Sequence, residues 1–429
     1  MNQLKPFQTA GVEYMKSTFR CILADEMGLG KTVQVAGLIN TCPGIQRVLI
    51  VCPASLKGNW HNELNAWLTR PLSIQILSGR TCDIEPTDIT IVNYDILSAH
   101  TEALLSGKAD SKGHIWDLVV FDEAHYLKSI SAERTKAARI VAPSAARLVF
   151  LTGTPLVNKP ADLFVMLNAI DSEQFKSKQA FEIRYCNGHN ERLKFGSKIV
   201  YRWNNFGATN IPELRSRLAP LMLRRLKADV LKDLPEKFHQ VIEIDAADMF
   251  RDVGLSGEWW NEVEHVSVSA TAQARKACGL DKVKAVATHV EMLFQEKNKV
   301  ILFGYHKDVI AALAEKLVKY NPVVITGETP ANKRTDLVKA FQESEKCRLF
   351  IGNIMAAGVG LTLTASDIVV FAELDWVPGN MKQAEDRAHR IGQKNNVLIQ
   401  YLVAPGIDAE IGRALARKIE VIEQTIGGP

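Results

Sequence analysis

The stretch Asp25-Glu26-Met27-Gly28-Leu29-Gly30-Lys31-Thr32 follows a short apolar run at residues 21–24 and opens an amphipathic segment. Between a strand and a helix, such a glycine-rich turn lets backbone N–H groups and the helix N-terminus hold phosphates. We predict that Lys31 neutralises the β- and γ-phosphates of a nucleotide and that Thr32 binds Mg²⁺. The common pattern has glycine where Asp25 stands, and a glycine-rich turn taken alone is more often structural. The nucleotide contacts predicted in this loop are Asp25, Met27, Gly28, Leu29, Gly30, Lys31 and Thr32.

Short apolar or β-branched runs alternate with amphipathic stretches on the C-terminal side of this turn, and the pattern returns later in the chain. Alternation of this kind is typical of parallel strands joined by helices. It predicts an α/β fold with two parallel-sheet lobes. The first group of runs lies at residues 21–24, 47–51, 89–92, 118–121 and 148–151, and the second at residues 299–303, 323–325, 348–351, 368–371 and 397–401.

The length of 429 residues is too great for one ordinary domain and fits two cores joined by smaller insertions. We predict a first lobe at residues 1–170 and a second lobe at residues 281–429. Between them, residues 171–280 are richer in charge and poorer in strand patterns, and they predict a helical insertion and linker with a probable helix at residues 211–232.

Composition excludes several classes of protein. Hydrophobic residues make up 47% and charged residues 23% of the chain, which is average for globular proteins, and no apolar run approaches the ~20 residues that span a bilayer. The N-terminus carries no export pattern, so we expect an intracellular protein that is not bound to a membrane. The seven cysteines form no CxxC pair, which argues against a zinc site. A net charge of +4 permits nucleic-acid binding without arguing for it.

A second motif, Asp122-Glu123-Ala124-His125, ends the apolar run at residues 118–121. Asp122 is predicted to hold Mg²⁺, and Glu123 to orient and deprotonate the attacking water, as phosphoryl transfer requires. A third motif, Leu151-Thr152-Gly153-Thr154-Pro155, follows another predicted strand and could couple the nucleotide state to the geometry of the lobes. Each motif alone could be a strand-end turn, but the three in this order indicate an ATPase.

The second lobe contributes two arginines within Gln383-Ala384-Glu385-Asp386-Arg387-Ala388-His389-Arg390-Ile391-Gly392-Gln393. The stretch has helical phase, so Arg387 and Arg390 should share one helix face. An arginine supplied by another lobe stabilises the γ-phosphoryl transition state only after closure, which makes hydrolysis depend on closure. Taken in isolation, the segment would be better interpreted as a helix with surface salt bridges.

The ordered motifs together resemble the SNF2 ATPases of helicase superfamily 2. Residues 221–230 with Leu234-Pro235-Glu236-Lys237, residues 371–379 and residues 181–186 are similar to the branch that contains the annealing helicases of stalled replication forks. The resemblance covers nearly the whole chain. It implies two RecA-like parallel-sheet lobes with helical SNF2-type insertions between them.

The resemblance also implies roles for further residues. Gln8 matches the glutamine that reads adenine, which favours ATP, and Gly360 and Gln383 match nucleotide contacts. Hydroxyls and backbone N–H groups at strand ends grip phosphates without reading bases. The implied DNA contacts are Ser55, Lys57, Tyr94, Thr326 and Thr362.

Four tryptophans could serve either in packing or in contacts with DNA. We interpret Trp60 as core packing. For Trp203, Trp259 and Trp260, a stacking or wedge role and buried hinge packing are about equally supported.

The leading hypothesis is a monomeric ATPase that uses ATP and Mg²⁺, translocates along double-stranded or forked DNA and reanneals or remodels it, with replication or repair proteins as partners. We expect a bare motor in the cytoplasm of a prokaryotic or virus-infected cell, or in the nucleus of a eukaryote. One alternative is a strand-separating helicase on DNA or RNA. Another is a nucleotide-binding clamp with a vestigial ATPase, which the intact Lys31, Asp122, Glu123, Arg387 and Arg390 argue against.

Overall fold

The computed structural model describes residues 3–156, 158–195, 198–244, 268–357 and 361–427. The chain divides into two compact units. Unit 1 comprises Met1–Lys232 and Val421–Pro429, and unit 2 comprises Asp233–Glu420. Within the described residues, none of the helices combines the length and the apolar composition that a membrane span needs.

Unit 1 is built on a parallel sheet of seven strands in the order β3-β4-β2-β5-β6-β1-β9. Strands β2 and β4 are buried at every residue, as strands covered on both faces must be. The five strands predicted in the first lobe are all confirmed. The strands are β1 Arg20–Leu23, β2 Val48–Cys52, β3 Ile74–Ile76, β4 Ile89–Asn93, β5 Trp116–Asp122, β6 Ala145–Leu151 and β9 Met222–Leu223.

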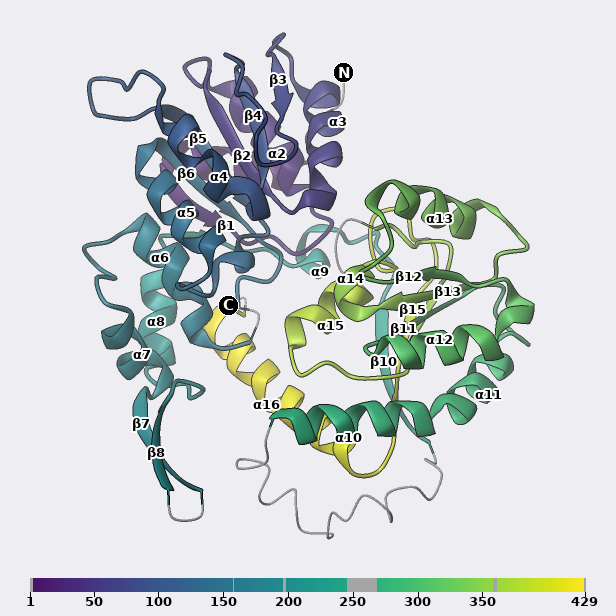
Figure 1. Ribbon diagram of the computed structural model, residues 1–429. Helices are drawn as coiled ribbons and strands as arrows, with labels where there is room; N and C mark the ends of the chain where they lie inside the picture. The colour runs from purple at the N-terminus through teal and green to yellow at the C-terminus, as the bar shows by residue number, and fades with distance from the viewer. Residues whose placement is uncertain (1–2, 157, 196–197, 245–267, 358–360, 428–429) are drawn as a thin grey trace. The chain divides into compact units, whose positions relative to one another are not determined.

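Helices cover both faces of this sheet (Figure 1). Alternate residues of one strand enter different hydrophobic clusters, since successive side chains point to opposite faces. Val119 and Phe121 pack with α4, α5 and α6, whereas Leu118 and Val120 pack with α1, α2 and α3. The helices are α1 Pro6–Ser17, α2 Lys31–Thr41, α3 Lys57–Trp67, α4 Tyr94–Leu105, α5 Glu133–Val141 and α6 Phe164–Ile170.

The region after α6 contains more strand than the sequence indicated. Its elements are α7 Lys178–Cys186, the antiparallel pair β7 His189–Phe195 and β8 Lys198–Asn204, then α8 Ile211–Leu218, β9 and α9 Lys227–Val230. The single helix predicted at residues 211–232 is wrong. Pro220 cannot continue a helix, and the following residues pair with β1 instead. Residues 171–232 group with unit 1, whereas the sequence predicted a separate middle region from 171 to 280.

Unit 2 has its own parallel sheet of six strands in the order β10-β15-β14-β11-β13-β12. All five strands predicted for the second lobe are present, so the predicted α/β fold with two parallel sheets is confirmed. The strands are β10 Lys237–Glu243, β11 Val300–Gly304, β12 Val323–Ile325, β13 Leu349–Asn353, β14 Ile368–Phe371 and β15 Val397–Val403. The helices are α10 Val268–Asp281, α11 Val283–Leu293, α12 Lys307–Lys316, α13 Ala331–Glu343, α14 Ile354–Ala357, α15 Pro378–Glu385 and α16 Ile407–Ile426, whose residues from Val421 onward group with unit 1.

Candidate ATP site and the residues around it

The glycine-rich loop runs from the end of β1 to the first residue of α2, Lys31. Gly28 has φ 84° and Gly30 has φ 72°, a left-handed conformation that other residues adopt only with strain. A Cβ at Gly30 would also come within 2.5 Å of Gln8 Nε2. Gln8 Nε2 donates to Leu29 O at 3.3 Å, so the predicted adenine-reading side chain lies against the loop. The loop therefore leads directly into the N-terminus of α2, which is the arrangement that phosphate binding requires.

The third motif approaches this loop closely. Lys31 Nζ donates to Asp25 O at 2.8 Å across the loop. A Cβ at Gly153 would lie 3.1 Å from Met27 N and 3.4 Å from Lys31 Nζ. Glycine at position 153 therefore lets the end of β6 pack directly against the phosphate loop, and the first and third motifs form one site.

Asp122 ends β5 and is held through three groups. Its Oδ2 accepts from Trp60 Nε1 at 2.7 Å, its Oδ1 from the backbone N–H of Glu123 at 2.9 Å, and its backbone oxygen from the Tyr94 hydroxyl at 2.8 Å. Burial, followed by the neighbouring Glu123 carboxylate, raises the pKa of Asp122 to about 6. A buried carboxylate of this kind gains from a cation, so the residue fits the predicted Mg²⁺ role.

This arrangement decides the roles of two aromatic residues. Trp60 is fully buried, which confirms the interpretation as core packing and adds a hydrogen bond to Asp122. Tyr94 is 1% exposed and stacks on Phe121 and Tyr126. Its side chain was predicted to contact DNA, and in this structure it instead supports Asp122 from within the core.

Glu123 adopts φ 48° and ψ 50°, which is unusual for a residue with a side chain. Strained backbone of this type is concentrated at functional sites. His125 Nδ1 lies 3.3 Å from Glu123 Oε2 and 3.3 Å from Thr152 Oγ1, and Thr152 Oγ1 accepts the backbone N–H of Thr154 at 3.1 Å. A chain of polar contacts therefore joins the second motif to the third.

The sequence interpretation did not identify the partners of Asp25, which is fully buried. Arg225 Nε donates to Asp25 Oδ1 at 2.8 Å, and Arg225 Nη2 also contacts Asp25 Oδ2. Gln34 Nε2 donates to Asp25 Oδ2 at 2.9 Å. The carboxylate at the usual glycine position thus anchors the phosphate loop to the segment after β9. The sequence did contain a signal for such a partner, because a buried acidic residue in a loop requires a cationic group nearby.

We expect Arg225→Met to destabilise unit 1 by about 3–5 kcal/mol, since it leaves the Asp25 carboxylate buried without its cation. Thermal and urea unfolding measure the loss. The double variant Asp25→Ala/Arg225→Met should regain most of it, because no charge is then left unpaired. The control Arg217→Met removes an exposed ion pair with Glu213 and should hardly change the melting temperature. A double variant as unstable as the single one would contradict this explanation.

Arg387 and Arg390 lie in unit 2, beyond the end of α15 at Glu385. The helix predicted to carry both arginines does not extend to them, because α15 ends at Glu385 and the residues that follow form turns with mixed backbone bonds. Ala388 N–H bonds the oxygen of Glu385 three residues back, and His389 N–H bonds the same oxygen four residues back. The two side chains nevertheless converge: Arg387 Nη1 and Arg390 Nη1 donate to Leu361 O at 3.4 and 3.0 Å. Gln383 is buried on α15, and Gly360 lies outside the described residues.

The remaining predicted DNA contacts occupy different environments. Ser55 is exposed, and Thr326 and Thr362 are half-buried. Lys57 Nζ donates to Leu77 O at 2.8 Å, which uses one of its three donors within unit 1. Their contact with DNA stays a prediction.

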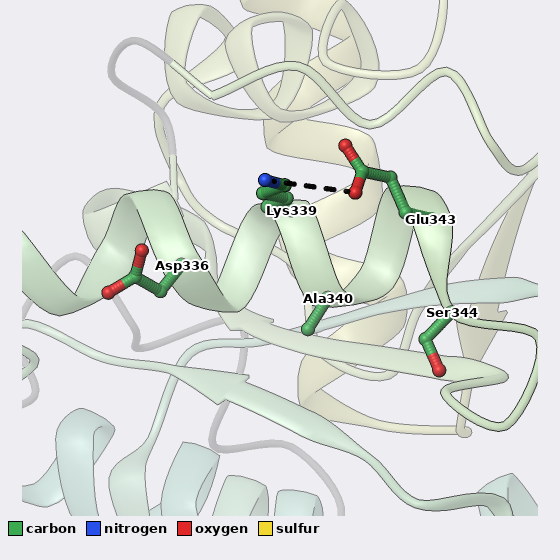
Figure 2. Close-up of a pocket in the computed structure, with 5 residues that line it drawn as sticks. All are labelled: Asp336, Lys339, Ala340, Glu343 and Ser344. Atoms are coloured by element: carbon green, nitrogen blue, oxygen red, sulfur yellow. Dashed lines mark ion pairs between the residues drawn. The ribbon is translucent and has the colours of Figure 1, made fainter.

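A shallow depression along α13, lined by residues of that helix and by Ser344, is not part of this site (Figure 2). Its lining residues Asp336, Lys339 and Glu343 are exposed, and Lys339 and Glu343 form an ion pair at 4.0 Å along the helix. Pairs of this kind stabilise a helix surface and do not converge on a ligand.

Comparison with known proteins finds two family domains along the chain. Residues 7–254 match the SNF2-related domain, and residues 281–392 match the helicase conserved C-terminal domain. The chain belongs to the SNF2 family. Among SNF2 relatives, it is 35% identical over 99% of its length to the Bos taurus "DNA annealing helicase and endonuclease ZRANB3". It is 36% identical over the same share to the Caenorhabditis elegans "SWI/SNF-related matrix-associated actin-dependent regulator of chromatin subfamily A-like protein 1 homolog".

The predicted resemblance to the annealing-helicase branch of the SNF2 family is therefore confirmed. The chain spans 41% and 62% of the lengths of these two relatives. A solved "Sulfolobus solfataricus SWI2/SNF2 ATPase core in complex with dsDNA" aligns with 99% of this chain and 93% of that one, at 23% identity and a TM-score of 0.47.

Proposed function

We propose that this chain is an ATP-dependent translocase on double-stranded DNA that remodels or reanneals forks or repair intermediates by coupling ATP hydrolysis to closure of its two lobes. One observation carries the ATPase part of the proposal. The phosphate loop with Lys31, the Asp122-Glu123 pair and the Thr152 to Thr154 turn are joined by direct contacts into a single site in unit 1.

The residues of this site have separable tasks. Lys31 and the N-terminus of α2 bind the phosphates of ATP, and Gln8 selects adenine. Thr32 and Asp122 hold Mg²⁺, which neutralises phosphate charge when bound. Glu123 orients the attacking water and accepts its proton, while His125 connects Glu123 to Thr152. Arg387 and Arg390 in unit 2 act on the γ-phosphate after closure.

The DNA part of the proposal is supported by family membership and by the relatives, whose names describe annealing-helicase and chromatin-regulator functions. We propose an intracellular monomer that acts on duplex or forked DNA together with replication or repair proteins. Ser55, Lys57, Thr326 and Thr362 contact the DNA backbone, and sequence-independent movement follows from contacts to phosphates rather than bases.

We expect double-stranded DNA to stimulate ATP hydrolysis strongly, RNA to stimulate it weakly, and duplex sequence to matter little. Stimulation should fall steeply with salt, since each neutralised phosphate contributes a slope of about −0.9 in log affinity against log salt. Phosphate release measured with duplex, single-stranded, forked and RNA oligonucleotides from about 50 to 200 mM salt tests this. Equal stimulation by RNA would favour a strand-separating helicase.

A further inference from the structure

The antiparallel hairpin of β7 and β8 extends from unit 1 beyond α7 (Figure 1). An isolated two-stranded ribbon is only marginally stable in water, so it needs an anchor. Glu182 on α7 is buried and supplies one. Its two oxygens accept from Trp203 Nε1 at 2.7 Å and from Asn205 Nδ2 at 2.6 Å. Trp203 is half-buried and anchors the base of the hairpin through this bond, whereas Trp259 and Trp260 lie outside the described residues.

The register of the hairpin separates its side chains into two unlike faces. Arg192 stands opposite Tyr201, and Glu191 stands opposite Arg202. Opposite residues of an antiparallel pair share a face, so Arg192 and Tyr201 lie together, and Glu191 and Arg202 lie on the other side. On that other side, Arg202 Nη2 forms an ion pair with Glu191 Oε2 at 2.9 Å. The charge of Arg202 is thereby neutralised within the hairpin.

The face that carries Arg192 and Tyr201 is open to solvent. Tyr201 is 67% exposed, and Arg192 is exposed as well. In sequence, residues 189–204 contain Glu191 as their single acidic residue, against the basic residues Arg192, Lys194, Lys198 and Arg202. An exposed aromatic ring beside a guanidinium on a positively charged ribbon matches unpaired nucleic acid, whose bases stack on aromatic rings and whose phosphates pair with arginine.

We propose that this Arg192–Tyr201 face binds unpaired DNA, with Tyr201 stacking on a base and Arg192 contacting an adjacent phosphate. The inference rests on the proposed function, because it assigns a further DNA contact to the same motor. Since the hairpin is anchored to α7 through Glu182, the contact belongs to unit 1 and would let the motor engage the single-stranded part of a forked substrate.

The test measures binding of the full chain to a short single-stranded oligonucleotide and to a fork with single-stranded arms, by fluorescence anisotropy. Tyr201→Ala should lower the affinity for both substrates about tenfold, because one base loses its stacking partner. Tyr201→Phe keeps the ring and should bind as the unmodified protein does. Arg192→Ala should also weaken binding and make it less dependent on salt, by roughly one phosphate contact. Hydrolysis stimulated by blunt duplex should stay within about twofold in all three variants, because blunt duplex offers no unpaired base to stack.

Arg202→Ala is the matched control, because it removes the same charge from the opposite face. It should leave binding to both substrates nearly unchanged. The inference is overturned if Tyr201→Ala binds as tightly as the unmodified chain, or if Arg202→Ala loses as much affinity as Arg192→Ala. Failure of the unmodified chain to respond to duplex DNA in the ATPase assay would count against the proposed function instead, since the hairpin inference concerns only differences between the variants and the unmodified chain.

Discussion

Glu123→Gln is expected to reduce ATP turnover by a factor on the order of 10²–10⁴ while ATP binding persists, since that is the range of a positioned general base. The amide keeps the shape of the carboxylate but cannot accept the proton of the attacking water. The phosphate loop, Lys31 and Asp122 are left in place. Phosphate release with duplex DNA measures turnover, and a fluorescent ATP analogue measures binding.

Lys31→Ala should abolish turnover by a different route, because it removes the positive charge at the phosphates and weakens ATP binding itself. Glu13→Gln, a change on the exposed side of α1, is the matched control for Glu123→Gln and should hydrolyse ATP normally. Normal turnover in Glu123→Gln would remove this residue from its assigned role. Equal loss of ATP binding in both site variants would show that Glu123 supports the loop rather than the water.

Arg387→Ala and Arg390→Ala are each expected to lower hydrolysis by a factor on the order of 10³ or more and to spare ATP binding and DNA binding. Both guanidinium groups converge on Leu361 O within unit 2, whereas the phosphate loop is in unit 1. If they act only after ATP and DNA have drawn the lobes together, binding survives while the rate collapses. Single-turnover hydrolysis with saturating duplex measures the effect.

Two variants make this result specific. Arg413→Ala removes an exposed arginine of α16 in unit 2 and should leave hydrolysis unchanged. Arg387→Lys keeps the charge but loses the planar fork of donors, so it should remain far below the unmodified rate. Melting temperatures are compared, because Arg387 is buried and Arg390 half-buried, so either substitution could also affect stability. Mutants that hydrolyse ATP normally with DNA present would assign these arginines to structure alone.

The sequence by itself determined the two parallel sheets and the core of the candidate ATP site. Strands buried on both faces appear as continuous apolar runs, so β2, β4, β5 and their counterparts in unit 2 could be predicted from local pattern. The phosphate loop and the Asp122-Glu123 pair could also be predicted from local sequence. The chemistry of each depends on a few adjacent residues at the end of a strand.

Only the tertiary structure decided which distant segments complete the site. Arg225 reaches Asp25 across 200 positions of sequence, and β9 has two residues whose strand conformation depends on pairing with β1. Tyr94 was predicted to contact DNA at the surface, yet its hydroxyl donates to the backbone oxygen of Asp122 within the core. Hydrogen bonds and ion pairs between remote segments leave no periodic signal in the chain. Those segments come together only when the strands pair into the sheet.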